Sequence, residues 1–67
     1  MAVARVTEIT ASSTKSFEDA TRIGVERANK TLENLKGAWI QEQKLKIEDG
    51  KIVEYRVNMK VTFILKE

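Results

Sequence analysis

The chain has 67 residues, a formal net charge of +2 from 12 basic and 10 acidic side chains, and neither cysteine nor histidine. This composition excludes a disulfide framework and removes the usual ligands of zinc and haem. Residues 1–67 are predicted to form one domain. A domain near this size buries only about 60% of the surface of its unfolded chain. We therefore expect oligomerisation or an unusually well-packed core to supply the remaining stability.

Several function classes find no support in the sequence. The charges are interspersed, without the basic stripe and interleaved aromatic residues of a nucleic-acid-binding protein. No apolar stretch suits a membrane span or a secretory signal, and the lack of cysteine fits a reducing cytoplasm. Without histidine, cysteine or a glycine-rich phosphate loop, the sequence offers no catalytic set. We expect a cytoplasmic protein that is not an enzyme and has no nucleic-acid or membrane partner.

The N-terminal residues predict a strand and the start of a helix. Residues 2–10 are rich in β-branched side chains and partly alternating, which indicates a strand. Residues 11–16 are then expected to form a small polar connector. Ser16 followed by Asp19 resembles a capping box, with Ser13 as a competing cap.

The expected helix runs from about Phe17 to Leu35. Lys36 and Gly37 are expected to end it. Its apolar residues recur at spacings of three and four, as Phe17, Ala20, Gly24, Ala28, Leu32 and Leu35. Glycine costs about 1 kcal/mol relative to alanine in a helix interior, so Gly24 indicates close packing of this helix on a sheet.

The remaining residues predict a β-hairpin. A second strand is expected over residues 38–48, and the Asp49-Gly50 pair predicts the turn because both central residues of such a turn need positive φ. From Val53 onward, apolar residues occupy every second position, and six of the seven residues between them are polar. The apolar positions are Val53, Tyr55, Val57, Met59, Val61, Phe63 and Leu65. This alternation indicates a strand with one buried face.

The predicted fold is β-α-β-β, a three-stranded antiparallel sheet wrapped around one helix, with strand order 1-3-2. The 14 residues from position 53 to 66 would reach about 45 Å as a strand at about 3.3 Å per residue. A compact globule of this length has a radius of gyration of about 11 Å, and the helix covers only about 28 Å. We therefore expect other copies of the chain to cover the rest of the strand.

Three segments carry a resemblance to a known family. They are VTEITASSTKSFEDA at 6–20, VERANKTLENL at 25–35 and EYRVNMKVTFILKE at 54–67, with the cap, helix, hairpin and last strand in register. The chain resembles the dodecins. This resemblance implies a hollow homo-dodecamer of cubic-type symmetry, formed of trimers, that binds and stores flavins such as FMN, riboflavin or lumichrome in the cytoplasm. For some members it also implies coenzyme A at trimer contacts.

The resemblance also implies a flavin site from which this sequence departs. In flavin-binding dodecins a Trp begins the second strand and a Gln follows the aromatic residue of the third strand. Here these positions carry Gly37 and Arg56, while Trp39 stands two residues later, on the same face and about 7 Å further along. Arginine donates hydrogen bonds but cannot accept one as glutamine does. An unpaired flavin N–H would cost about 1–3 kcal/mol, or about tenfold to hundredfold in affinity.

A second branch of the family lacks the Trp and carries Arg in place of the Gln, and some of its members are described as binding calcium. Residues 40–56 resemble that branch. Calcium takes about six to eight oxygen ligands. The carboxylates near the hairpin, Glu42, Glu48 and Asp49, are too few in one chain, and no DxDxDG pattern is present. A calcium site would therefore need several copies of the chain, and its ligands stay unassigned.

The residues near the expected ligand site have more than one interpretation. Trp39 has three interpretations. It is a platform for a small planar ligand, or it packs across a two-fold contact against its symmetry mate or Arg56, or it packs within its own chain. Four basic residues have two interpretations: they form a phosphate-binding patch for FMN or coenzyme A, or they protect exposed strands from aggregation. These residues are Lys44, Lys46, Lys60 and Arg56.

The candidate ligand-binding residues are therefore Gly37, Trp39, Lys44 and Arg56. The leading hypothesis is a cage that sequesters small molecules with an altered flavin site. The alternatives are a true flavin store using Trp39 and Arg56, and a structural or calcium-binding dodecamer.

Overall fold

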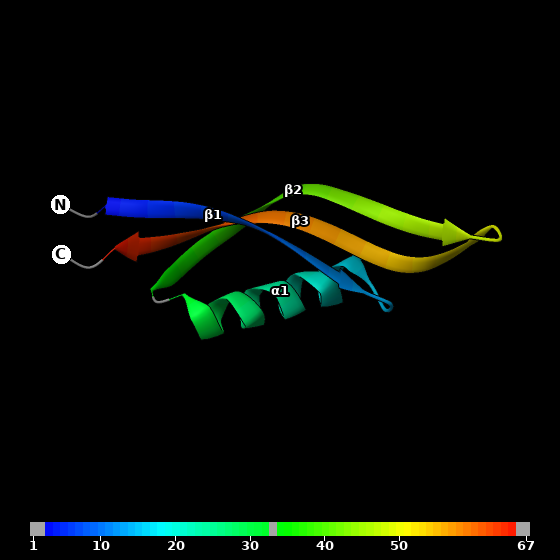
Figure 1. Cartoon of the computed structure of the whole chain (residues 1–67), viewed down its shortest axis with the longest axis horizontal. Helices are drawn as coiled ribbons and strands as arrows, with labels where there is room; N and C mark the ends of the chain where they lie inside the picture. The colour runs from blue at the N-terminus through cyan, green and yellow to red at the C-terminus, as the bar shows by residue number, and fades with distance from the viewer. Residues whose placement is uncertain (1–2, 33, 66–67) are drawn as a thin grey trace.

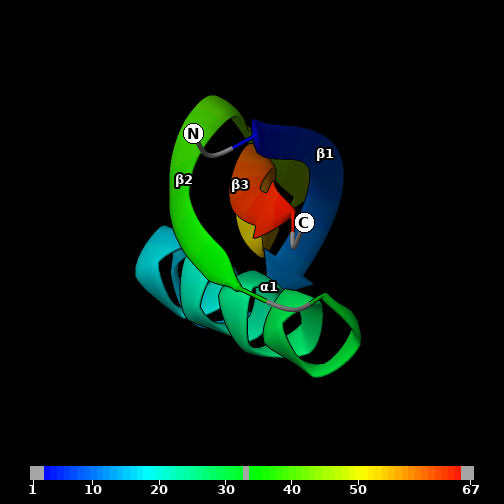
Figure 2. The same ribbon diagram turned by 90° about the vertical axis from the view of Figure 1, so that its left-hand side faces the viewer.

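The computed structural model describes residues 3–32 and 34–65, which fold into four elements in the predicted β-α-β-β order. These are β1 (Val3–Ser13), α1 (Phe17–Thr31), β2 (Leu35–Glu48) and β3 (Lys51–Leu65). The strands form an antiparallel sheet of order β1-β3-β2, which confirms the predicted topology. The helix lies along one side of the strongly twisted sheet (Figure 1), and Figure 2 shows the strands curving over it.

Strand β1 is longer than predicted. It continues through Ser12 and Ser13, which pair with Arg56 and Tyr55 of β3. The expectation of a connector starting at position 11 was therefore wrong, because pairing with the long β3 carries the strand through these small polar residues. Ser13 is buried, and its hydroxyl donates to Asp19 Oδ2 over 2.6 Å.

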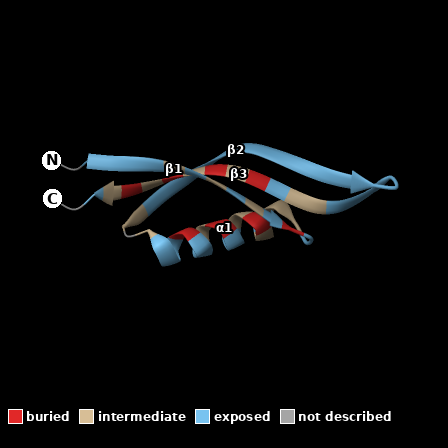
Figure 3. Ribbon diagram, in the orientation of Figure 1, coloured by how far each residue is buried: buried red, intermediate tan, exposed pale blue. Residues whose placement is uncertain are grey.

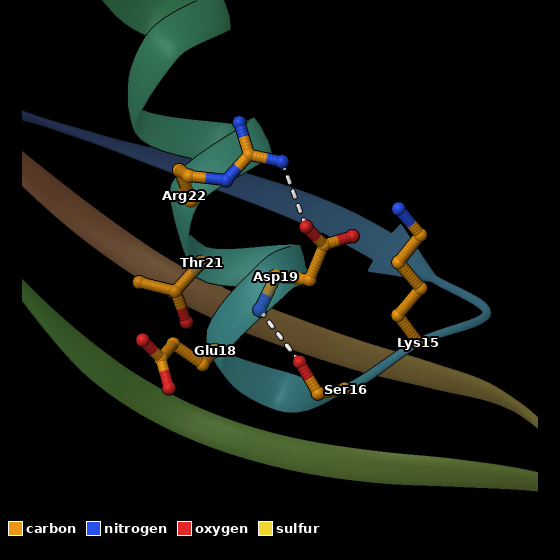
Figure 4. A pocket seen from close by; sticks show the side chains of 6 residues that line it. All are labelled: Lys15, Ser16, Glu18, Asp19, Thr21 and Arg22. Atoms are coloured by element: carbon orange, nitrogen blue, oxygen red, sulfur yellow. Dashed lines mark hydrogen bonds and ion pairs between the residues drawn. The ribbon is translucent and has the colours of Figure 1, made fainter.

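The start of α1 is capped by Ser16, as predicted. Its Oγ accepts a hydrogen bond of 2.9 Å from the Asp19 backbone N–H (Figure 4). The Asp19 carboxylate accepts from the Ser13 hydroxyl and, over 2.7 Å, from the Arg22 guanidinium. These bonds lower the pKa of the Asp19 carboxyl below its ordinary value, and the bond from Ser13 has the larger effect. Asp19 thereby ties the end of β1 to the first turn of α1.

The helix ends at Thr31, four residues earlier than expected. Leu32 is already extended, with its N–H bonded to the Ala28 carbonyl over 2.8 Å, and Asn34 takes a left-handed φ of 58°. Asparagine tolerates this conformation better than most residues, so the chain reverses there. Leu35 then begins β2, which was expected to start at residue 38. The prediction that Gly37 ends the helix was therefore wrong.

The core lies between α1 and the middle of β3. Val57, Met59 and Val61 are fully buried in alternation, and Ala20 packs against them from α1. A Cβ added to Gly24 would come within 2.9 Å of the Met59 methyl carbon and 3.0 Å of the Ala11 Cβ. This confirms the close helix–sheet packing predicted from the glycine.

The hairpin extends beyond the end of the helix. Asp49 and Gly50 both have positive φ, 52° and 76°, as predicted for the turn. Figure 3 shows β2 exposed along nearly all of its length, and the apolar row of β3 becomes exposed at both ends, at Val53 and Leu65. The described residues extend 52 Å along their longest axis, with a radius of gyration of 13.9 Å. One helix does not cover this sheet, as expected from the strand length.

Candidate functional site

The predicted ligand-binding residues all lie on the sheet face turned away from α1, called here the outer face. Because the buried residues of β3 point toward α1, the residues between them point away from it. Residues directly opposite each other in an antiparallel pair share a face. The register places Gly37 opposite Thr62, Trp39 opposite Lys60, and Lys44 opposite Arg56.

Within one chain, the outer face separates Trp39 from Arg56. The cross-strand partner of Trp39 is Lys60, four residues from Arg56 on β3, a distance of about 13 Å along a strand. A register irregularity between Ile40 and Glu42 falls between the two positions. The outer face therefore has two parts, a tryptophan end and an arginine end.

The tryptophan end is open. The Trp39 side chain is 49% exposed, although aromatic residues contribute most when buried. At Gly37, an added Cβ would meet no heavy atom of the described residues within 4 Å. This end of the outer face therefore has room for a flat molecule or for another subunit beside the indole.

The arginine end gathers charged groups around a small hollow. Arg56 donates through Nη2 to Glu54 Oε1 over 3.0 Å, and this bond is the main cause of a lowered pKa at Glu54. Lys44 faces Arg56 directly across the sheet, and like charges in that position repel each other. The hollow has a volume of about 220 Å³ and is lined by Thr10, Glu42, Lys44, Arg56 and Asn58. An anion beside Lys44 and Arg56 would relieve their repulsion.

Lys46 belongs to the same end as Lys44 and Arg56, and these three residues line a second hollow with Leu45. Lys60 instead faces Trp39. The structure therefore brings together three of the four residues of the predicted basic patch.

Asn58 was not singled out by the sequence pattern, which marked it only as a polar position. Its Nδ2 donates to Thr10 Oγ1 over 3.0 Å. Its Oδ1 is buried and has no hydrogen-bond partner within residues 3–32 and 34–65. Buried polar atoms are usually paired, so this oxygen is an acceptor that a ligand, a water molecule or another subunit would satisfy. Only the structure shows that Asn58 lies at the hollow beside Arg56.

The carboxylates considered for calcium are spread out. Glu42 faces Asn58, whereas Glu48 and Asp49 lie at the hairpin turn. In the part of the chain that the structure describes, no three acidic, histidine or cysteine side chains are grouped as a metal site requires. The helix described is not long and apolar enough to cross a membrane.

Comparison with known proteins gives the family. The family model for dodecins matches residues 3–66. None of the curated proteins compared with the chain matches it significantly. Among solved structures, a dodecin from Streptomyces davaonensis is 38% identical, with a TM-score of 0.94, and 98% of this chain and 97% of that chain are covered.

Two further structures extend the comparison. An arginine-to-alanine mutant of the Thermus thermophilus dodecin is 30% identical, with a TM-score of 0.94 and 100% of both chains covered. A protein of Mycobacterium tuberculosis, described as a calcium-chelating immunodominant antigen and a calcium dodecin, is 31% identical, with a TM-score of 0.82 and coverage of 96% of this chain and 91% of that one. The fold, the family model and these relatives together show that the chain belongs to the dodecin family.

Proposed function

We propose that this chain assembles into a hollow homo-dodecamer built from trimers and that the cage binds or sequesters small molecules without catalysis. The observation that carries the proposal is the half-exposed Trp39 on an open outer face, next to the space above Gly37. Exposed apolar residues on the hairpin support the assembly, since a soluble protein rarely leaves a long apolar strand face uncovered.

The flavin site of such a cage is altered in this chain. Gly37 offers no stacking surface at the position where the family resemblance places a tryptophan. Arg56 is held by Glu54, and its remaining N–H groups can donate to carbonyl or phosphate oxygens but cannot accept from a ring N–H. We therefore expect weak binding of oxidised flavins compared with dodecins that carry the Trp and Gln.

The second candidate function is a true flavin store using Trp39 and Arg56. The exposure of Trp39 and its position on the same face as Gly37 favour it. Because about 13 Å of strand separates the two side chains within one chain, a flavin held by both would contact Trp39 of one copy and Arg56 of another. Lys44 and Lys46 would then lie near a flavin phosphate or coenzyme A.

Calcium binding is supported by the Mycobacterium tuberculosis relative, which is described as a calcium dodecin with a novel calcium-binding site. In this chain the three carboxylates near the hairpin are spread over β2 and its turn. Calcium would therefore need carboxylates from several copies meeting at a symmetry axis.

Sedimentation mass tests the assembly, and ligand titrations on the same sample separate the functions. A mass of twelve chains, with riboflavin fluorescence quenched only weakly, is the expected result. The matched variant is Gly37→Trp/Arg56→Gln, which restores the stacking surface and the acceptor. We expect it to bind riboflavin at least about tenfold more tightly than the unmodified protein.

Three other results would change the conclusion. Strong quenching by the unmodified protein, lost in Trp39→Ala, would establish the flavin store. A melting temperature raised by calcium but not by magnesium would favour the cation hypothesis. A monomer at every concentration would contradict the cage.

A further inference from the structure

A groove of about 670 Å³ runs between β1 and α1, beside the core. Its floor is apolar and consists of Ile9, Ala11, Ile23, Gly24, Ala28 and Leu32. Gly24 and Ala28 are buried in this floor, where Met59 and Ala11 pack closely against Gly24. Ile23 remains 39% exposed, so the described part of the chain leaves this groove unfilled.

The rim of the groove carries a positive charge. Arg27 lines the groove, and it takes part in none of the ion pairs found among the described residues. Arg22, on the same helix, is instead held by Asp19 over 2.7 Å and by Glu26 over 3.1 Å. An apolar floor beside a guanidinium that has no ion-pair partner among residues 3–32 and 34–65 fits a partner with apolar side chains next to carboxylates.

The chain itself carries such a surface at the hairpin tip, defined as residues 47–52. Ile47 and Ile52 face each other across the strands and are 59% and 48% exposed. Glu48 and Asp49 follow directly, and Lys51 lies opposite Glu48, so the tip places two apolar side chains next to a net negative charge. Figure 1 shows the tip beyond the first turn of α1, where its own helix does not cover it.

We propose that the hairpin tip of a second copy docks in the groove between β1 and α1. Ile47 and Ile52 then lie on the apolar floor, and the carboxylates of Glu48 and Asp49 lie beside Arg27. This inference rests on the proposed assembly and assigns the surfaces that form it. A chain cannot fill its own groove in this way, because its hairpin is a continuous part of the sheet that points away from the helix.

The contact has a consequence for symmetry. The tip and the groove are different surfaces, so each copy donates a tip to one neighbour and receives one from another. Such head-to-tail contacts form a closed ring when the rotation between copies closes. A trimer within the cage meets this condition.

A charge exchange tests the contact in the full chain. Arg27→Glu and Glu48→Lys each place like charges together, and we expect each to raise the concentration at half-dissociation by at least about tenfold. The combined variant Arg27→Glu/Glu48→Lys restores opposite charges and should recover most of the loss, as a double-mutant cycle measures. Lys30→Glu, an equal charge change on the same helix but outside the groove lining, is the control and should change the assembly much less.

Cross-linking provides a second measurement that does not depend on stability. The chain has no cysteine, so an introduced pair reports only its own contact. Thr31 lines the groove one turn beyond Arg27. Mixing a Thr31→Cys variant with a Glu48→Cys variant under mild oxidation should give a disulfide-linked dimer. Glu18→Cys replaces Thr31→Cys in the control mixture, because Glu18 lines a different hollow at the start of α1 (Figure 4), and should give none.

The outcomes separate this inference from the proposed cage. A twelve-chain mass that all the charge variants keep, with no cross-link to Thr31→Cys, overturns the docking contact and leaves the cage standing. A wild-type monomer overturns both. Binding of a fluorescent fatty acid that Arg27→Glu abolishes without change of mass would show that the groove holds a small amphiphile, which also overturns the docking contact.

Discussion

The two halves of the β2–β3 hairpin both carry apolar residues but differ in burial. Over the helix, Val57, Met59 and Val61 are fully buried. Toward the turn, Val53, Ile52 and Ile47 are 38%, 48% and 59% exposed. The difference shows that α1 covers only part of the apolar pattern of this sequence, which leaves the rest for the proposed assembly to cover.

The largest expected difference between the halves is in side-chain truncation. Met59→Ala removes a fully buried side chain and should lower the free energy of unfolding by about 2–5 kcal/mol. Ile47→Ala should change it by no more than about 0.5 kcal/mol in the dissociated chain, while weakening assembly. Urea denaturation in dilute solution measures the first effect and sedimentation measures the second. Equal losses of unfolding free energy would contradict the comparison.

The two glycines in regular structure sharpen the comparison. Gly24→Val brings carbon atoms against Met59 and Ala11, and overpacking of this kind should destabilise the chain by about 1–3 kcal/mol. Gly37→Val meets open space within a strand, where β-branched residues are favoured, and should be neutral or stabilising. Thermal denaturation of both variants checks the prediction, and a stabilised Gly24→Val protein would show that the helix is not closely packed there.

Among the described residues, the two non-glycine residues with positive φ lie at opposite ends of β2. Asn34→Ala and Asp49→Ala each keep a β-carbon in the left-handed region but remove the short polar side chain that makes this conformation tolerable, at a cost of about 1 kcal/mol. We expect a larger loss for Asn34, whose carbonyl accepts from Ile64 N–H over 3.1 Å and whose side chain donates to the Ile64 carbonyl. Replacing either residue by glycine relieves the backbone strain. If both glycine variants lose as much as the alanine variants, the left-handed conformation is not the cause.

The smallest expected effect is a pH dependence of the folding stability that arises from Asp19, in the first turn of α1. The lowered pKa of Asp19 means that folding is stabilised by its ionised form above the ordinary value of 3.8. This stabilisation is lost as the pH falls through the lowered value. Ser13→Ala removes the main cause of the shift and should reduce the dependence of stability on pH in this acid range. Thr14→Ala, a neighbouring exposed hydroxyl, is the control, and equal acid profiles for all three proteins would count against Asp19.

Much of the fold follows from local sequence signals. The Asp49-Gly50 turn, the Ser16 cap and the alternation of β3 each depend on neighbouring residues, and the structure confirms them. The errors fall where distant residues decide. Pairing with β3 lengthens β1 through Ser13. The chain reverses at the left-handed Asn34, whereas the sequence pattern predicted the end of the helix at Gly37.

The candidate site was predictable in part. Register placed Trp39 and Gly37 on one face, because strand side chains alternate. The irregularity near Gln41 places Trp39 opposite Lys60, on the same face as Arg56, and no residue type marks this irregularity in the sequence. The position of Asn58 depends on a contact with Thr10, 48 residues away in the sequence. Contacts of this kind require the paired strands to be in place.

Both outer strands of the sheet, β1 and β2, have one backbone edge without a partner strand in the described part of the chain. Such edges attract other extended chains and can start aggregation during synthesis. Lys44 and Lys46 on β2 discourage random pairing, because each incoming strand must approach their charges. In the proposed assembly, a newly made chain either associates with other copies or aggregates, so slow expression at low temperature should raise the yield of assembled particles.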